Sequence, residues 1–173
     1  MEQRYKKPAM DAAALWDYAL KAVAARAHSI GELREKLRRR AEREEDVDGV
    51  LDRLKEYGYL NDKRFAESFA SSRLSNEKFG KTRVVHDLRQ RRVAPALAEK
   101  TVESVYQDVD ESAMIEDWIR RKYRTADRET LFQEDKDLAG AYRRLSRAGF
   151  RTSDIVRVLK RFAKNPELLD GLE

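Results

Sequence analysis

Three stretches of the chain share one internal spacing of apolar residues, and this repeat limits the possible folds more than any other feature of the sequence. The stretches read LRRRAEREEDVDGVL, LRQRRVAPALAEKTV and LSRAGFRTSDIVRVL, and they start 51 and then 57 positions apart. In each, an apolar residue stands ten positions after the first leucine and another follows four positions later, which is the step between neighbours on one helix face. The ends of the stretches are therefore predicted to be buried: Leu37, Leu51, Leu88, Val102, Leu145 and Leu159.

An amphipathic segment precedes each stretch, so that the repeating unit consists of a leading helix and two further helices. The leading segments read AAALWDYALKAVAARA, DKRFAESFASSRL and ESAMIEDWIRRKY. Regular repetition of a helical unit is typical of arrays in which neighbouring units stack. We therefore predict an all-α fold, an elongated, curved array of three tandem three-helix repeats with about nine helices and no sheet.

The predicted organisation along the chain has five parts. These are a flexible N-terminal tail (residues 1–10), repeat 1 (residues 11–60), repeat 2 (residues 61–109), repeat 3 (residues 110–164) and a C-terminal tail (residues 165–173). Local signals support the helix ends, because Ser29 and Glu32 have the spacing of a capping box and Pro95 suits the first turn of a helix. Gly58 and Gly149 suit left-handed positions after helix ends.

The composition limits the compartment and the available chemistry. The chain has no cysteine, which excludes disulfides and thiolate metal sites and fits a reducing compartment. No apolar run approaches the roughly 20 residues of a membrane-spanning helix. Lys6 and Lys7 are not followed by the apolar segment of a signal peptide. We expect a cytoplasmic protein that does not associate with membranes.

Residues that could carry catalysis are scarce. The two histidines, His28 and His86, are far apart in the sequence, and no glycine-rich phosphate-binding loop is present. Five carboxylates between Glu42 and Asp48 lack the spacing of an EF-hand and suit the start of a helix, where the macrodipole favours acids. We interpret His28 as a loop or capping neighbour rather than a ligand. The sequence thus predicts a protein that is not an enzyme and holds no cofactor or metal.

Arginines recur at similar places in the three stretches. With 37 Lys+Arg against 32 Asp+Glu the net charge is +5, which favours an acidic protein or a nucleic acid as the partner. We predict that one surface, the basic edge, contacts this partner; its residues are Arg38, Arg39, Arg89, Arg91, Arg92, Arg143, Arg144 and Arg147. The competing interpretation is a solvated helix face whose arginines pair with acids such as Glu32 and Glu35. The third stretch fits that interpretation least, because Asp154 is the only acid from Arg143 through Lys164.

The third stretch also has the form of a helix-turn-helix, with Gly149 in the turn. Such a motif reads DNA by placing one helix in the major groove. Because the same pattern occurs three times, a lone DNA-reading motif is the less favoured interpretation. Most of the large aromatic side chains fall on apolar helix faces, which favours core packing over base stacking; they are Trp16, Phe65, Phe69, Trp118, Tyr123 and Phe162.

One passage, VLDRLKEYGYLNDKRFAESFASSRL followed by FGKTRVVHDLRQRRV, closely resembles the RecX family, bacterial regulators of the RecA recombinase. The matching positions are Leu54, Gly58, Tyr59, Leu60, Asp62, Phe65, Ala66, Phe69, Arg73, Gly80, Arg83, Val84 and Leu88. The segment HSIGELREKLRRR is similar to the opening helix of the family, and the resemblance covers about residues 12 to 105. The first stretch departs from the other two, because Glu42 stands where they have Val93 and Phe150.

The resemblance implies a non-enzymatic regulator of homologous recombination, DNA repair and the SOS response. Proteins of this family bind the groove of the RecA filament on single-stranded DNA and restrain filament growth, ATP hydrolysis, strand exchange and coprotease activity. We accordingly expect the basic edge to contact RecA or, without sequence preference, DNA, and we expect a monomer. The alternatives are a direct DNA-binding regulator of the helix-turn-helix type and a small hydrolase that uses surface carboxylates.

Overall fold

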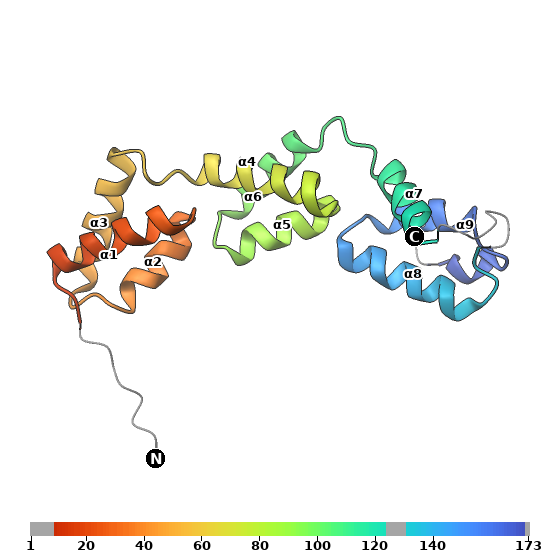
Figure 1. The fold of residues 1–173 in the computed structure, drawn as a ribbon, viewed down its shortest axis with the longest axis horizontal. Helices are drawn as coiled ribbons and strands as arrows, with labels where there is room; N and C mark the ends of the chain where they lie inside the picture. Colours follow the sequence, from red (N-terminus) through yellow and green to blue (C-terminus); the bar gives the residue numbers. More distant parts are fainter. Residues whose placement is uncertain (1–8, 124–130, 172–173) are drawn as a thin grey trace, which may run out of the picture. The chain divides into compact units, whose positions relative to one another are not determined.

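The structure, a computed structural model, describes residues 9–123 and 131–171, and within these ranges all regular secondary structure is helical (Figure 1). The α-helices are α1 (Ala12–Ala25), α2 (Ile30–Arg38), α3 (Glu44–Glu56), α4 (Asp62–Ser72), α5 (Lys81–Gln90), α6 (Pro95–Val105), α7 (Glu111–Lys122), α8 (Asp135–Ala148) and α9 (Thr152–Lys160). A π-helical turn, η1 (Arg73–Glu77), follows α4, and a 3-10 helix, η3 (Pro166–Leu169), follows α9. The predicted all-α class is confirmed. None of the helices in the described ranges is long and apolar enough to cross a membrane.

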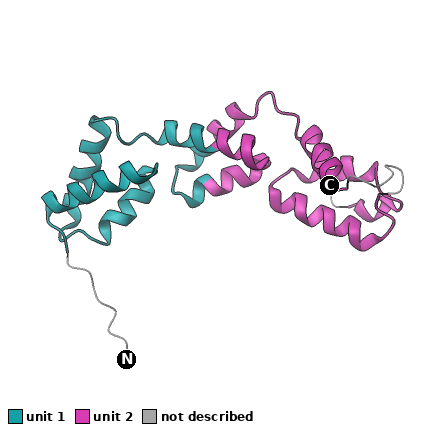
Figure 2. Cartoon of the chain, viewed as in Figure 1, with its two compact units in different colours: residues 1–69, 88–98 teal, residues 70–87, 99–173 magenta. Residues whose placement is uncertain are grey.

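The chain forms two compact units (Figure 2). The first contains residues 1–69 and 88–98, and the second contains residues 70–87 and 99–173. This division passes through α4, α5 and α6, the helices of predicted repeat 2. The repeat boundaries and the elongated, curved arrangement stay predictions.

The core of the first unit lies among α1, α2 and α3, with α3 packed against both of the others. Leu15 and Ala19 of α1, Leu33 and Leu37 of α2 and Leu51 of α3 are completely buried. Burial of a leucine side chain contributes about 1.5–3 kcal/mol, so this cluster is a main source of stability for the unit.

The core of the second unit lies around α9, which packs against α7, α8 and η3. Ile115 of α7, Leu145 of α8 and Ile155 and Leu159 of α9 are completely buried. Ile155 and Leu159 are four residues apart on α9 and therefore share the helix face that is buried. All six positions that the repeat spacing predicts to be buried are at most 1% exposed, and that prediction is confirmed.

The local signals at the helix ends are also confirmed. Ser29 and Glu32 form both hydrogen bonds of a capping box at the start of α2, and α6 begins at Pro95. Gly58 and Gly149 have φ angles of 73° and 86°, which lie in the left-handed region that glycine adopts without strain. Three carboxylates of the acidic run, those of Glu44, Glu45 and Asp46, lie in the first turn of α3, near the positive end of the helix dipole.

Both predicted tails contain ordered backbone within the described residues. Residues 1–8 of the N-terminal tail lie outside those residues, but the Met10 backbone N–H donates a 2.7 Å hydrogen bond to the carbonyl of Arg40. In the C-terminal tail, η3 places Leu169 in the core of the second unit, with 2% of its surface exposed. Leucine at this position therefore stabilises the unit.

The departure in the first stretch has a structural counterpart. Glu42 is exposed, whereas Val93 and Phe150 at the equivalent positions are buried. After α2 the backbone pairs with the N-terminal segment, because the Glu42 N–H donates to the carbonyl of Met10 at 2.8 Å.

Candidate interaction surface

The eight arginines of the predicted basic edge lie in different surroundings. Arg38, near the end of α2, has its guanidinium 2.6 Å from the Glu44 carboxylate and 3.8 Å from that of Glu35. Arg39 follows at the end of the same helix and is exposed, and Arg89 is exposed on α5. Within the first stretch, Arg38 is thus neutralised by neighbouring acids, as the competing interpretation describes.

Arg91 and Arg92 hold two segments of the first unit together. The Arg91 guanidinium lies 3.1 Å from the Glu32 carboxylate and 5.2 Å from the centre of the Phe69 ring. Arg92 has a left-handed backbone with φ of 60°, and its guanidinium lies 3.6 Å from the Glu35 carboxylate. These two side chains therefore have structural partners within the first unit.

The same segments form a close backbone contact, which we call the first joint. The Ser29 hydroxyl donates to the carbonyl of Arg91, and the Ile30 N–H donates to the Asp62 carboxylate at 2.7 Å. A Cβ at Gly31 would stand 2.5 Å from that of Arg92, so only glycine fits here without displacement of the neighbour. Burial raises the pKa of the Asp62 carboxyl above its ordinary value, and the hydrogen bond from Ile30 opposes this rise.

A second joint in the second unit repeats this arrangement. The Lys81 N–H donates to the Glu111 carboxylate at 2.9 Å, and the Gly80 N–H donates to the carbonyl of Ala148 at 2.8 Å. A Cβ at Gly80 would lie 2.2 Å from the Gly149 carbonyl oxygen. Glu111 is 6% exposed, and burial raises the pKa of its carboxyl, whereas the hydrogen bond from Lys81 lowers it.

The role of Glu111 is absent from the sequence predictions, although the repeat carries a signal for it. Lys81 stands 51 positions after Ile30, as Leu88 does after Leu37, and Glu111 begins α7 as Asp62 begins α4. A carboxylate at the start of the leading helix therefore recurs in repeats 2 and 3. Both carboxylates accept the first backbone N–H of another helix, which would otherwise have no partner.

The remaining arginines, Arg143, Arg144 and Arg147, lie on α8 and are exposed. We call them the α8 basic face; Arg147 stands four residues after Arg143 and three after Arg144, which places it beside both on the helix surface. Arg143 and Arg147 form no salt bridge with a carboxylate of the described residues. Asp154, the first acid after them in the sequence, is occupied by the guanidinium of Arg157 and the hydroxyl of Ser112.

Two further side chains adjoin the α8 basic face. The Arg83 guanidinium donates a 2.9 Å hydrogen bond to the carbonyl of Arg147 and lies 4.1 Å from the centre of the Phe79 ring. Burial raises the pKa of the Tyr123 phenol, and the neighbouring Arg144 lowers it. Arg83 thus adds a cation beside Arg147, whereas Arg144 has a partner of its own.

The chemistry of this surface is that of charge recognition. No group of three or more histidine, aspartate or glutamate side chains in the described part of the chain has the geometry to hold a metal ion. Arginine guanidinium groups match carboxylates and phosphates through paired N–H donors. The α8 basic face can therefore bind an acidic protein surface or a phosphate backbone.

Comparisons with known proteins agree with the resemblance described above. Two family models match the chain: "RecX, first three-helix domain" over residues 16–54 and "RecX, second three-helix domain" over residues 61–102. A Regulatory protein RecX from Escherichia coli is 31% identical over 94% of this chain and 98% of its own length. Another, from Syntrophotalea carbinolica, is 27% identical over 80% of this chain and 89% of its own.

Solved structures show the same fold. A crystal structure of RecX from Lactobacillus salivarius matches 87% of this chain and 96% of its own length with a TM-score of 0.69, at 16% sequence identity. A crystal structure of a regulatory protein RecX matches 85% of this chain and 72% of its own with a TM-score of 0.62. The two matching domain models, the relatives that cover nearly the whole chain and the shared helical fold lead to one conclusion: the chain belongs to the RecX family of regulatory proteins.

Proposed function

We propose that this chain is a non-enzymatic regulator that binds the RecA filament on single-stranded DNA and inhibits its growth, ATP hydrolysis, strand exchange and coprotease activity. Membership in the RecX family supports this proposal, because the relatives are named regulatory proteins. The proposal includes a cytoplasmic location, a monomeric state and a role in recombination, DNA repair and the SOS response.

The observation that carries the proposal is the α8 basic face. Arg143 and Arg147 are exposed and have no carboxylate partner within the described residues, so their charges are available to another molecule. Charge complementarity of this kind accelerates association and sets the register of a complex. A filament that presents acidic side chains or DNA phosphates supplies the matching charge.

The other arginines of the basic edge contribute to the proposal to different degrees. Arg38, Arg91 and Arg92 already pair with carboxylates of the first unit, so a partner would have to compete with those pairs. Arg39 and Arg89 are exposed and remain in the proposed contact set. We therefore expect the largest effects from changes on α8.

The test is the ATPase activity of RecA on single-stranded DNA, titrated with the full chain. We expect the native chain to inhibit, and we expect Arg143→Glu with Arg147→Glu to require roughly tenfold more protein for half-inhibition. Lys21→Glu with Lys100→Glu changes the net charge equally at exposed positions on α1 and α6 and should inhibit like the native chain.

Melting curves of both double variants provide the folding control, because exposed charges contribute only about 0–1 kcal/mol each to stability. If Arg143→Glu with Arg147→Glu inhibits at the same concentration as the native chain, the α8 basic face is only solvated and does not contact the partner. An absence of inhibition by the native chain would contradict the proposed function itself.

One alternative has its own supporting observation. The segment α8–Gly149–α9 has the form of a helix-turn-helix with arginines on its first helix, which is compatible with a direct DNA-binding regulator. However, Gly80 and Thr82 occupy the carbonyls of Ala148 and Gly149, so the turn is packed against α5 within the second unit. We expect the full chain to bind duplex DNA weakly, with steep salt dependence and little sequence preference. A preference of roughly a thousandfold for one operator would favour the alternative.

A further inference from the structure

The turn Gly58-Tyr59-Leu60, one of the segments that carries the family resemblance, leaves an aromatic side chain in solvent. Gly58 reverses the chain with φ of 73°, and the Tyr59 N–H donates to the carbonyl of Leu54 at 2.9 Å. Leu60 then enters the core and is 4% exposed, whereas Tyr59 is 54% exposed. The buried leucine thus holds the neighbouring tyrosine at the surface.

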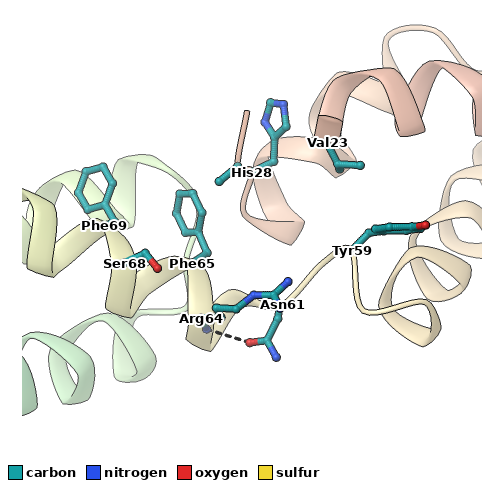
Figure 3. A pocket seen from close by; sticks show the side chains of 9 residues that line it. Val23, His28, Tyr59, Asn61, Arg64, Phe65, Ser68 and Phe69 are labelled. Atoms are coloured by element: carbon teal, nitrogen blue, oxygen red, sulfur yellow. Dashed lines mark hydrogen bonds between the residues drawn. The ribbon is translucent and has the colours of Figure 1, made fainter. Parts of the chain in front are cut away.

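Two hollows of the first unit adjoin this tyrosine, with volumes of about 320 and 340 Å³. Both are lined by Val23, Tyr59 and Arg64, and we call them together the Tyr59 groove. Figure 3 shows the residues that line the hollow of about 320 Å³, with Val23 and Tyr59 on one side and Phe65 and Phe69 of α4 on the other. The walls are mostly aliphatic and aromatic, which is typical of a site that accepts an apolar group.

Arg64 is the charged side chain of this groove. Its guanidinium donates a 2.8 Å hydrogen bond to the carbonyl of Gly58, which fixes it beside the Tyr59 turn. It has no salt bridge with a described residue, and no carboxylate is among the described residues that line either hollow. Burial lowers the pKa of His28, the other basic side chain in the lining, so the neutral imidazole is favoured there.

Further aromatic rings extend this surface. The Tyr57 ring lies 5.9 Å from that of Trp16 and 6.2 Å from that of Tyr59, and Tyr57 is 59% exposed. The Arg53 guanidinium lies 4.1 Å from the centre of the Trp16 ring. Tryptophan, tyrosine and arginine are the residue types that contribute most binding energy at protein interfaces.

We infer that the Tyr59 groove binds a segment of a protein partner that inserts one apolar side chain beside Tyr59 and offers a carboxylate to Arg64. The charge of Arg64, which no lining carboxylate balances, favours an anionic group next to the apolar one. A single-stranded nucleic acid is the less favoured occupant, because such ligands are bound along grooves with many cations. This inference concerns the first unit and does not depend on the α8 basic face or on the proposed function.

The experiment is a titration of the full ¹⁵N-labelled chain, followed by amide chemical shifts. The probe is the peptide acetyl-Gly-Ser-Phe-Asp-Ser-Gly-amide, compared with one peptide in which serine replaces phenylalanine and another in which asparagine replaces aspartate. We expect millimolar binding that shifts the amide signals of Tyr59, Asn61 and Arg64. Each replacement should weaken binding, by roughly fivefold for the loss of the carboxylate.

Two substitutions assign the effects to the groove. Arg64→Gln should bind the aspartate and asparagine peptides equally, whereas Tyr59→Ala should weaken both. Arg39→Gln, at an exposed arginine outside the groove, should bind like the native chain. Amide spectra of the free variants establish that each remains folded.

Three outcomes would overturn the inference. One is that none of the peptides shifts the groove signals at millimolar concentration. Another is that Arg64→Gln still distinguishes the aspartate from the asparagine peptide. The third is that a 15-nucleotide oligothymidine shifts the groove signals more strongly than the peptide does, which would identify a nucleic-acid site instead.

Discussion

Asp62 and Glu111 perform the same task in the two compact units: each carboxylate accepts the first backbone N–H of a helix, from Ile30 at 2.7 Å and from Lys81 at 2.9 Å. Glu111 is buried and Asp62 is half-buried, and the partial loss of water raises the pKa of each carboxyl. Each carboxyl group therefore provides the hydrogen-bond acceptor that the first N–H of a helix needs, although its surroundings disfavour its ionised form.

Glu111→Gln should raise the melting temperature at pH 7. Glutamine keeps a carbonyl oxygen for the Lys81 N–H and, like the protonated acid, carries no charge. Because the folded-state pKa is raised, the ionised carboxyl lowers the free energy of unfolding as the pH rises above the unfolded value of 4.5. The gain should thus shrink as the pH falls to 4, and thermal melts at pH 4 and pH 7 measure it. Asp62→Asn should behave in the same way.

Glu111→Ala provides the contrast, because alanine removes the acceptor. The buried Lys81 N–H would then lack a partner, which costs about 1–3 kcal/mol. An equal stability of Glu111→Ala and Glu111→Gln at pH 7 would contradict the role of this hydrogen bond.

Gly80→Ala should destabilise the chain, because the added Cβ would stand 2.2 Å from the Gly149 carbonyl oxygen and 2.5 Å from the Phe150 nitrogen. Overpacking of this kind costs about 1–3 kcal/mol. Gly140→Ala is the matched control, since nothing lies within 4 Å of a Cβ at this position of α8. It should stabilise by about 0.5–1 kcal/mol through helix propensity. Urea unfolding of the two variants measures the difference, and similar values would refute the close approach.

His28→Gln should weaken the loss of stability in mild acid. Burial, followed by the charges of Arg26 and Lys36, lowers the pKa of His28, while Glu32 raises it. The unfolded chain therefore binds a proton more readily than the folded chain, and the free energy of unfolding falls as the pH drops through 6.5. Urea unfolding between pH 7.5 and pH 5.5 measures the slope, with His86→Gln as the control for loss of an exposed imidazole. If the free energy of unfolding of His28→Gln falls with pH as steeply as that of the native chain, protonation of His28 does not cause the loss of stability.

Leu88→Ala should cost roughly 2–5 kcal/mol, because the side chain is completely buried and its removal leaves a cavity. Leu168→Ala is the comparison, since Leu168 is 48% exposed and should change stability by less than about 0.5 kcal/mol. A loss below about 0.5 kcal/mol for Leu88→Ala would show that this position does not belong to the core.

The core could be predicted from the sequence because helix periodicity determines which residues share a face. Leu37, Leu88 and Leu145 recur with constant internal spacing, and each is completely buried. The capping box at Ser29 and the left-handed turn at Gly149 were predictable for a related reason, since each depends on a few neighbouring residues.

The surroundings of the arginines could not be predicted in the same way, because they depend on partners distant in the chain. Arg91 pairs with Glu32, which lies 59 positions earlier, and Arg92 adopts a left-handed backbone that glycine favours. Helix periodicity does not distinguish such arginines from Arg143 and Arg147, which have no carboxylate partner in the described part of the chain.

The two joints also explain how a sequence of this type can diverge by duplication. At equivalent places the carbonyls of Arg40, Arg91 and Ala148 accept hydrogen bonds from Met10, Ser29 and Gly80, respectively. Since the acceptor is a main-chain oxygen in every copy, most side chains around it can mutate without loss of the bond. The requirements that remain in the two joints are a glycine at the close approach, an acid at the start of the leading helix and, in the first joint, the hydroxyl of Ser29. A gene that copies one such module inherits both, and the copies can then acquire different surfaces while they still join.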